Sequence, residues 1–229
     1  MSIGKIIAQW LFILCLPVLL LTSSVSAAMN CRALYTYGFN KYDISRVTGL
    51  APGELKKAAD GLIHYFNSGE ENINLIVIKD GQPFVLFNER EVQHLKDVKG
   101  LFRLVYKLLM GTLIYALLYA SVTLARRQDR RRLAKGLLFG SGLTLLLMLA
   151  LGIIMALDFD GFFLQFHLLS FANDFWLLNP ATDYLIMLFP EGFWFDATLV
   201  VAIGTAVGAI ILGGVGWWRL KKDRALLSP

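Results

Sequence analysis

Histidine is the side chain best suited to proton transfer near neutral pH, because its unperturbed pKa lies near ~6.5. The chain contains three histidines, His64, His94 and His167. Cys15 lies inside an apolar run, and neither it nor Cys31 is expected to be a catalytic thiol. The sequence also has no G-x-S-x-G motif of an activated serine. The histidines are therefore the residues to examine first for proton-transfer chemistry.

The three histidines stand in different surroundings. His64 lies on the polar face of a predicted helix, where a solvated surface role is expected. His94, in "EREVQHLKDVK", has Arg90 four residues before it and Asp97 three after, so all three share one helix face. Taken alone, such a group can be a structural network. His167, in a separate connector after "DFDGFFLQF", makes a second candidate.

The connector at residues 166–196 is rich in acids that lack a nearby base. It holds nine aromatic residues and four carboxylates but no lysine or arginine. Buried carboxylates must be paired, hydrogen-bonded or protonated. The basic residues available near the other segment are Arg90, Lys96, Arg103 and Lys107. The connector is therefore expected to fold back on that segment and to bring His167 close to His94.

Four apolar segments separate the polar parts of the chain. The composition, 56% hydrophobic and 17% charged, is typical of a polytopic membrane protein. A helix needs ~20 apolar residues to cross a bilayer core. The segments that qualify are 6–28, 101–125, 136–157 and 197–218. The sequence thus predicts an α-helical integral membrane protein with four transmembrane helices and a small α+β extracytoplasmic cap at residues 29–100.

Basic residues flank these segments unevenly. The loop 126–135 has six basic residues against one acid, and the tail 219–229 has four against one. By the positive-inside bias, both termini are expected in the cytoplasm, and residues 29–100 and 158–196 on the outer side. The net charge of +5 then reflects topology and lipid anchoring, so no nucleic-acid partner is expected. The first segment also resembles a signal peptide, so its cleavage is an alternative to its retention as a helix.

The cap is expected to contain an amphipathic helix and a hairpin. In "APGELKKAADGLIHYFNSG", Pro52 suits the first turn of a helix and Gly69 its end. The apolar positions recur at helical spacing and predict one buried face. Two β-rich runs flank Asp80 and Gly81, a dipeptide that favours a tight hairpin turn.

Two further helix starts are visible. Asn88 and Glu91 form an N-x-x-E capping arrangement, so a helix is expected to begin there and to continue into the span at 101–125. Asn179, followed by a proline, is expected to cap a short helix that ends at Phe189.

Three stretches carry a family resemblance. "YTYGFNKYDISRVTG", "LFNEREVQHLKDVK" and "FHLLSFANDFWLLNPATDYLIMLFPEGFWFD", in this order among four spans, resemble the bacterial lipoprotein intramolecular transacylase family. The resemblance implies that the sn-2 acyl chain of a diacylglyceryl-modified cysteine passes to that cysteine's α-amino group, giving a lyso-form lipoprotein. It also implies a multi-pass protein of the bacterial cell membrane that acts among membrane lipids, with no cofactor and no metal.

The resemblance assigns the two catalytic histidines to His94 and His167. One would deprotonate the amine and the other protonate the departing glyceryl oxygen, in an order that stays open. Leu95 stands where many relatives are expected to have methionine, which is a conservative difference. Supporting roles are open as well. An oxyanion could be stabilised by Arg90 or Asn173, and an imidazole could be oriented by one of the acids Asp97, Asp174, Asp183 and Glu191.

Two other classes of function are weighed against this one. A zinc hydrolase would combine the two histidines with Asp174 or Asp183, although no H-E-x-x-H spacing is present. A non-catalytic membrane sensor or assembly protein would use the cap to bind another protein and the acids for folding alone. Substitution of His94 discriminates, because a sensor tolerates it and a transacylase does not.

Overall fold

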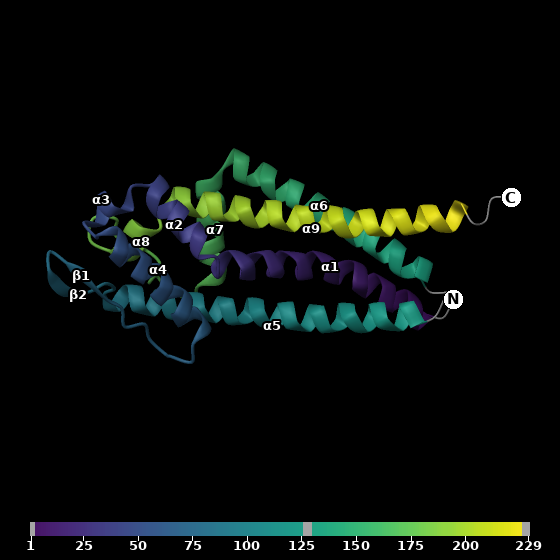
Figure 1. Cartoon of the computed structure of the whole chain (residues 1–229), viewed down its shortest axis with the longest axis horizontal. Helices are drawn as coiled ribbons and strands as arrows, with labels where there is room; N and C mark the ends of the chain where they lie inside the picture. Colours follow the sequence, from purple (N-terminus) through teal and green to yellow (C-terminus); the bar gives the residue numbers. More distant parts are fainter. Residues whose placement is uncertain (1–2, 126–129, 226–229) are drawn as a thin grey trace. The chain divides into compact units, whose positions relative to one another are not determined.

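The computed structural model describes residues 3–125 and 130–225, which form two compact units. One, called here the helical unit, comprises Met1–Ser26, Val105–Ala156 and Leu199–Pro229. The other, the mixed unit, comprises Ala27–Leu104 and Leu157–Thr198 and contains every residue predicted to belong to a site. The order of the elements along the chain is shown in Figure 1.

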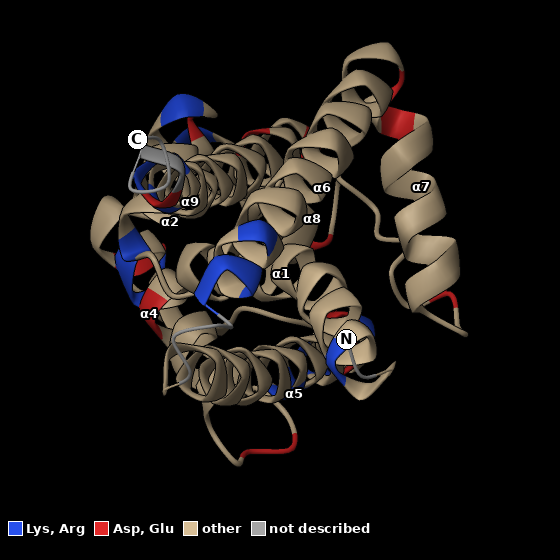
Figure 2. Ribbon diagram, turned by 90° about the vertical axis from the view of Figure 1, so that its right-hand side faces the viewer, with Lys and Arg blue, Asp and Glu red and all other residues tan. Residues whose placement is uncertain are grey.

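Long helices dominate the chain. Among the described residues, four are long and apolar enough to cross a membrane, namely α1 (Ile3–Met29), α5 (Glu89–Ala125), α6 (Arg130–Leu157) and α9 (Glu191–Ala225). Their ribbons are mostly free of charged residues (Figure 2). The prediction of a four-span helical membrane protein is therefore confirmed. Three of these helices extend well past the apolar segments, because polar residues continue the same hydrogen-bonded turns.

Small residues let the helices of the helical unit pack closely. At Gly140 of α6 an added Cβ would lie 3.0 Å from the Cβ of Leu16 in α1. At Gly216 of α9 it would lie 2.7 Å from the carbonyl oxygen of Ala134 in α6. Close backbone approach of this kind is how apolar helices associate without a hydrophobic driving force.

The mixed unit combines short helices, a hairpin and the ends of the long helices. Its remaining elements are α2 (Arg32–Lys41), α3 (Ile44–Thr48), α4 (Pro52–Asn67), β1 (Ile76–Lys79), β2 (Gln82–Val85), α7 (Phe159–Ser170) and α8 (Tyr184–Leu188). The strands pair antiparallel, with Val77 opposite Phe84. Asp80 and Gly81 both have positive φ, 52° and 77°, as a type I′ turn requires, so the predicted hairpin is confirmed.

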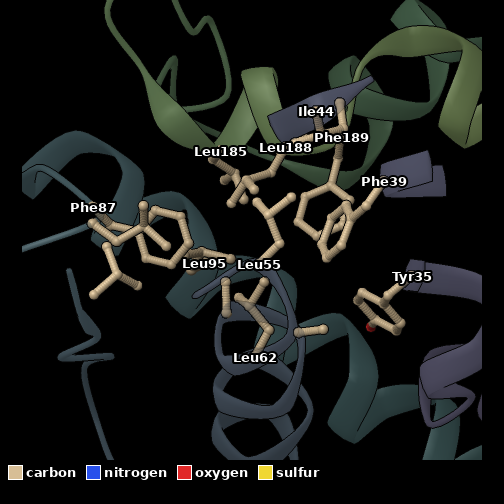
Figure 3. Close-up of a cluster of buried hydrophobic side chains, with 14 of the residues drawn as sticks. Tyr35, Phe39, Ile44, Leu55, Leu62, Phe87, Leu95, Leu185, Leu188 and Phe189 are labelled. Carbon is tan, nitrogen blue, oxygen red and sulfur yellow. The ribbon is translucent and has the colours of Figure 1, made fainter. Parts of the chain in front are cut away.

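One hydrophobic core holds this unit together. Figure 3 shows Leu55 and Leu62 of α4, Leu95 of α5, and Leu185 and Leu188 of α8 converging on the same space. The predicted buried face of α4 is present, with Tyr65 as an addition that the apolar pattern did not indicate. Segments distant in the sequence are thus fixed against one another by apolar burial.

The start of α5 is tied to the start of α8. The Asn88 backbone N–H donates to Glu91 Oε2 at 2.7 Å, and the Glu91 N–H donates to Asn88 Oδ1 at 3.1 Å, which confirms the predicted capping arrangement. The other oxygen of Glu91 accepts the Leu185 N–H at 2.6 Å. Glu91 is only 1% exposed, and burial raises the pKa of its carboxyl. One buried side chain therefore caps two helices.

The short helix before α9 begins later than predicted. The expected helix started after Asn179 and ended at Phe189, whereas α8 covers only Tyr184–Leu188. The Asn179 side-chain oxygen instead accepts the Ala181 N–H at 3.0 Å, and the Asn179 backbone N–H donates to Asp183 Oδ2 at 2.7 Å. These bonds hold residues 179–183 in a turn, because the side chains offer the backbone an alternative to helical bonding.

Candidate active site

The mixed unit brings His94 and His167 together. The centroids of the two imidazole rings lie 6.1 Å apart, with their planes inclined by 29°. His94 projects from the second turn of α5, and His167 from the last turn of α7. Both are buried, at 7% and 8% exposure. The predicted proximity of the two histidines is thus present, whereas His64 is largely exposed on α4.

Aromatic rings enclose the pair. The His167 ring lies 4.4 Å from Phe163, 5.5 Å from Phe166 and 5.0 Å from Trp176, measured between centroids. Phe171 touches both imidazoles, at 4.9 Å from His94 and 5.6 Å from His167. We call these four aromatic residues the aromatic enclosure. Phe163 and Phe171 stand four residues before and after His167, a spacing that places side chains on one helix face, so for these two the sequence carried a signal.

His167 has a defined tautomer. Its Nδ1 lies 2.8 Å from the carbonyl oxygen of Phe163, four residues earlier in α7. A carbonyl oxygen only accepts, so Nδ1 carries the hydrogen and Nε2 of the neutral ring keeps its lone pair. Burial lowers the pKa of His167, and the hydrogen bond to Phe163 opposes that shift. A buried imidazole with a free lone pair can accept a proton.

His94 is held in its neutral form. Burial, and secondarily the charge of His167, lowers the pKa of His94 to about 4, against a smaller opposing effect of Asp97. Its Nδ1 atom is buried and has no hydrogen-bond partner within residues 3–125 and 130–225. An orphaned polar atom in a folded protein calls for a partner, since leaving it unpaired is costly.

Asp97 and Asn173 form a second link between α5 and the connector. The side-chain amide of Asn173 donates to Asp97 Oδ2 at 2.9 Å, and its oxygen accepts the Phe175 N–H at 3.1 Å. Asn173 follows Phe171 of the aromatic enclosure by two residues. This pair therefore braces the wall of the histidine site, and its amide N–H is engaged with Asp97.

The connector does fold back on α5, but its acids do not use the expected bases. Arg90 donates to the backbone carbonyl of Asp174 rather than to a carboxylate. Lys96 pairs with Glu71 at 2.6 Å. Asp196 forms an ion pair with Lys41 of α2, at 2.7 Å. The prediction of these partners was wrong because it considered charge alone, whereas nearby amides and the unforeseen helix α2 supply closer donors.

The remaining predicted acids are also satisfied elsewhere. Asp183 accepts the side-chain amide of Asn88 at 3.0 Å. Glu191 shares a hydrogen bond with Asp160, which raises the pKa of Glu191. Neither acid forms a hydrogen bond to His94 or His167 within the described part of the chain. In the same part, no three histidine, cysteine or carboxylate side chains come together as a metal site would require.

Comparison with known proteins places this chain in a family. The family model described as "Lipoprotein intramolecular transacylase Lit" matches residues 10–194. An uncharacterized protein of Aquifex aeolicus (strain VF5) is 29% identical over 189 residues, covering 78% of this chain and 82% of the relative.

Solved structures of similar proteins share the fold of this chain. The membrane integral lipoprotein intramolecular transacylase Lit from Bacillus cereus has a TM-score of 0.84 at 22% identity, covering 97% of this chain and 98% of that chain. A variant of the Bacillus cereus protein with one histidine replaced by alanine has a TM-score of 0.80 at 22% identity, covering 97% and 96%. The chain is a multi-pass membrane protein, and it belongs to the lipoprotein intramolecular transacylase Lit family.

Proposed function

We propose that this chain moves the sn-2 acyl chain of a lipoprotein's S-diacylglyceryl-cysteine to the α-amino group of the same cysteine. The observation that carries the proposal is the buried pair of imidazoles, 6.1 Å apart, in which His94 Nδ1 has no partner among the described residues and His167 Nε2 keeps its lone pair. Membership of a transacylase family supports the choice of reaction. The product is an N-acyl, S-monoacylglyceryl lipoprotein.

His167 takes protons from the attacking nitrogen. Its Nδ1–H bond to the Phe163 carbonyl orients the ring and leaves Nε2 as the acceptor. Over the whole reaction the ammonium nitrogen loses two protons. One passes to solvent, and the other reaches the glyceryl oxygen when its bond to the acyl carbon breaks. His167 can accept each proton in turn and return one of them to the leaving oxygen.

His94 acts as a neutral hydrogen-bond donor. With a pKa of about 4 it carries no charge at pH 7, yet a neutral imidazole still has one N–H. With that hydrogen on the unpartnered Nδ1, His94 donates to the ester oxygen as negative charge develops there. This division of labour differs from the expectation of one base and one acid, because so low a pKa makes a protonated His94 scarce.

No protein nucleophile is required in this reaction. The amine and the ester belong to the same lipid-modified cysteine, so attack is intramolecular and gains from proximity. The aromatic enclosure keeps water from the tetrahedral intermediate, which favours transfer over hydrolysis. Asn173 and Asp97 position the connector that carries these rings.

The proposal includes an orientation in the cell membrane. With the basic residues of the loop at 126–135 and of the tail in the cytoplasm, the segments 29–100 and 158–196 face the outer side. Lipoproteins and membrane lipid then meet the histidines there, and nucleic acid has no part.

Mass spectrometry tests the function directly. A lipoprotein's N-terminal peptide is isolated from a host that makes only diacylglyceryl lipoproteins and expresses this chain. We expect one acyl chain to move from glycerol to the α-amino group with the intact protein and with His64→Ala, which alters an exposed histidine. His167→Ala should leave the peptide diacylglyceryl.

Two outcomes favour other functions. An unchanged peptide beside abundant intact protein supports a sensor or assembly role. Loss of activity on treatment with a chelator, restored by zinc, supports a metal-dependent hydrolase instead.

A further inference from the structure

A polar cavity of about 650 Å³ opens beside the histidine pair. It is lined by three short segments of the mixed unit, from the loop after α4, from α5 and from the end of α7. Its lining residues are found at 69–71, 96–97, 99–101, 103 and 170–173. This volume lies within the range of ordinary ligand sites.

The cavity is separated from the imidazoles by one aromatic ring. Phe171 lines the cavity and also touches both His94 and His167. The hydrogen-bonded pair of Asp97 and Asn173 lies in the same wall. A substrate whose reacting atoms meet the histidines can therefore extend into the cavity past Phe171.

The cavity wall mixes polar and apolar surface, and its charges balance. Three cations, Lys96, Lys99 and Arg103, face three acids, Glu70, Glu71 and Asp97. Two of the cations are occupied, since Lys96 pairs with Glu71 and Lys99 donates to the Glu70 carbonyl at 2.7 Å. Such a wall offers both hydrogen-bond donors and acceptors, and because its charges balance it does not attract an anion. It suits neutral main-chain amides better than a phosphate.

Part of the surface of α7, the helix that carries His167, is apolar. Phe166, Leu168 and Leu169 of α7 are exposed, Leu169 by 87%, and α7 has no lysine or arginine (Figure 2). A lipid-modified cysteine likewise has two sides, acyl chains on its glyceryl group and a polypeptide on its carbonyl. The exposed face of α7 matches the first, and the polar cavity matches the second.

We propose that this cavity, lined by residues 69–71, 96–97, 99–101, 103 and 170–173, binds the polypeptide segment that directly follows the lipid-modified cysteine. This inference rests on the proposed transacylase function. It adds that the enzyme recognises the protein part of its substrate through main-chain contacts, so binding depends on the presence of a peptide more than on its side chains.

Gly100 provides a way to fill the cavity without disturbing its walls. It lines the cavity from α5, and an added Cβ there would meet no atom within 4 Å. We therefore expect the side chain of Gly100→Leu to fill part of the cavity. Gly111→Leu is the matched control, because it also lies within α5 with open space around its Cβ but does not line the cavity.

Two lipids probe the site in detergent micelles. One is S-diacylglyceryl-cysteine with an amide cap, and the other carries four neutral residues after the cysteine. Binding is measured with ether-linked analogues of both, which cannot transfer an acyl chain, and turnover with the esters. We expect the peptide-bearing analogue to bind about tenfold more tightly, as a few net hydrogen bonds would allow. Gly100→Leu should abolish that difference, and Gly111→Leu should keep it.

Equal affinity of the two analogues for the intact protein would overturn the inference, as would an unchanged ratio in Gly100→Leu. If Gly100→Leu weakens both analogues equally, the cavity holds lipid head groups and the inference is again wrong. Failure of the ester lipids to react with the intact protein contradicts the proposed function separately, because the binding ratio does not depend on turnover.

Discussion

His94 and His167 face each other across 6.1 Å, one from the start of α5 and the other from the end of α7. The positive charge of a protonated His167 further lowers the pKa of His94, so the two rings resist carrying protons together. His167 can therefore carry one proton between a nitrogen and an oxygen of the same substrate while His94 stays neutral. Burial of both rings strengthens this exclusion.

Replacing His94 by glutamine should reduce catalysis without unfolding the protein. Glutamine fills a similar volume but cannot reproduce the orientation of a ring N–H toward the substrate. We expect His94→Gln to lower kcat by ~10²–10³-fold, the usual effect of losing one oxyanion donor. Single-turnover assays with a diacylglyceryl lipopeptide measure this. His64→Gln should retain full activity, and equal losses in both variants would contradict the assignment.

Stability should fall as the pH drops from about 6.5 toward about 4. The folded pKa of His94 is about 4 and its ordinary value is 6.5, so the unfolded chain binds more protons between these values. The neutral ring therefore makes its full contribution to stability above pH 6.5. On the order of 3 kcal/mol of the free energy of unfolding is lost by pH 4. Thermal unfolding in detergent, compared between the intact protein and His94→Gln, isolates this contribution. Parallel pH curves for the two proteins would refute it.

Truncating Glu91 should destabilise the mixed unit. In Glu91→Ala the N–H groups of Asn88 and Leu185 lose their buried acceptor, at a cost of about 2–4 kcal/mol. Glu91→Gln keeps one acceptor oxygen and should cost less. Denaturant unfolding in detergent provides the measurement. Glu89→Ala, an exposed acid in the same turn of α5, should change stability by less than ~0.5 kcal/mol.

Exchanging the Asp97 and Asn173 side chains should restore the activity that either single substitution removes. Asn173→Asp sets two carboxylates against each other where an amide now donates at 2.9 Å, and we expect a loss of activity of about tenfold. The double variant with Asp97→Asn and Asn173→Asp recreates the hydrogen bond in the reverse direction. Recovery of activity in the double variant supports a positioning role. Additive losses would show that each side chain acts independently.

Local features of the mixed unit were readable from the sequence. The hairpin at Asp80 and Gly81, the helix beginning at Pro52 and the capping of α5 by Asn88 depend on neighbours within a few residues. Such interactions are set by backbone conformation and short-range hydrogen bonds, which a residue pattern records. The later start of α8 was missed because Asn179 and Asp183 bond to each other instead of to a helix.

The partners of the acids were not readable in this way. Asp196 and Lys41 are far apart in the chain, and nothing in either segment indicates the other. The same holds for Glu91, whose pattern predicts a cap on its own helix but not the second bond to Leu185. Partners of this kind depend on which segments the hydrophobic core brings together.

The sequence by itself determined that the chain spans a membrane, and it indicated imidazole as the candidate group for its chemistry. The length of the apolar segments and the types of residue carry that information, because crossing a bilayer and transferring a proton each depend on residue type. Only the tertiary structure decided the state of each histidine. Burial sets the pKa of His94, the Phe163 carbonyl sets the tautomer of His167, and Phe171 divides both from the polar cavity. These properties arise from groups that meet only when distant segments pack, since solvent exclusion and hydrogen-bond geometry belong to the fold.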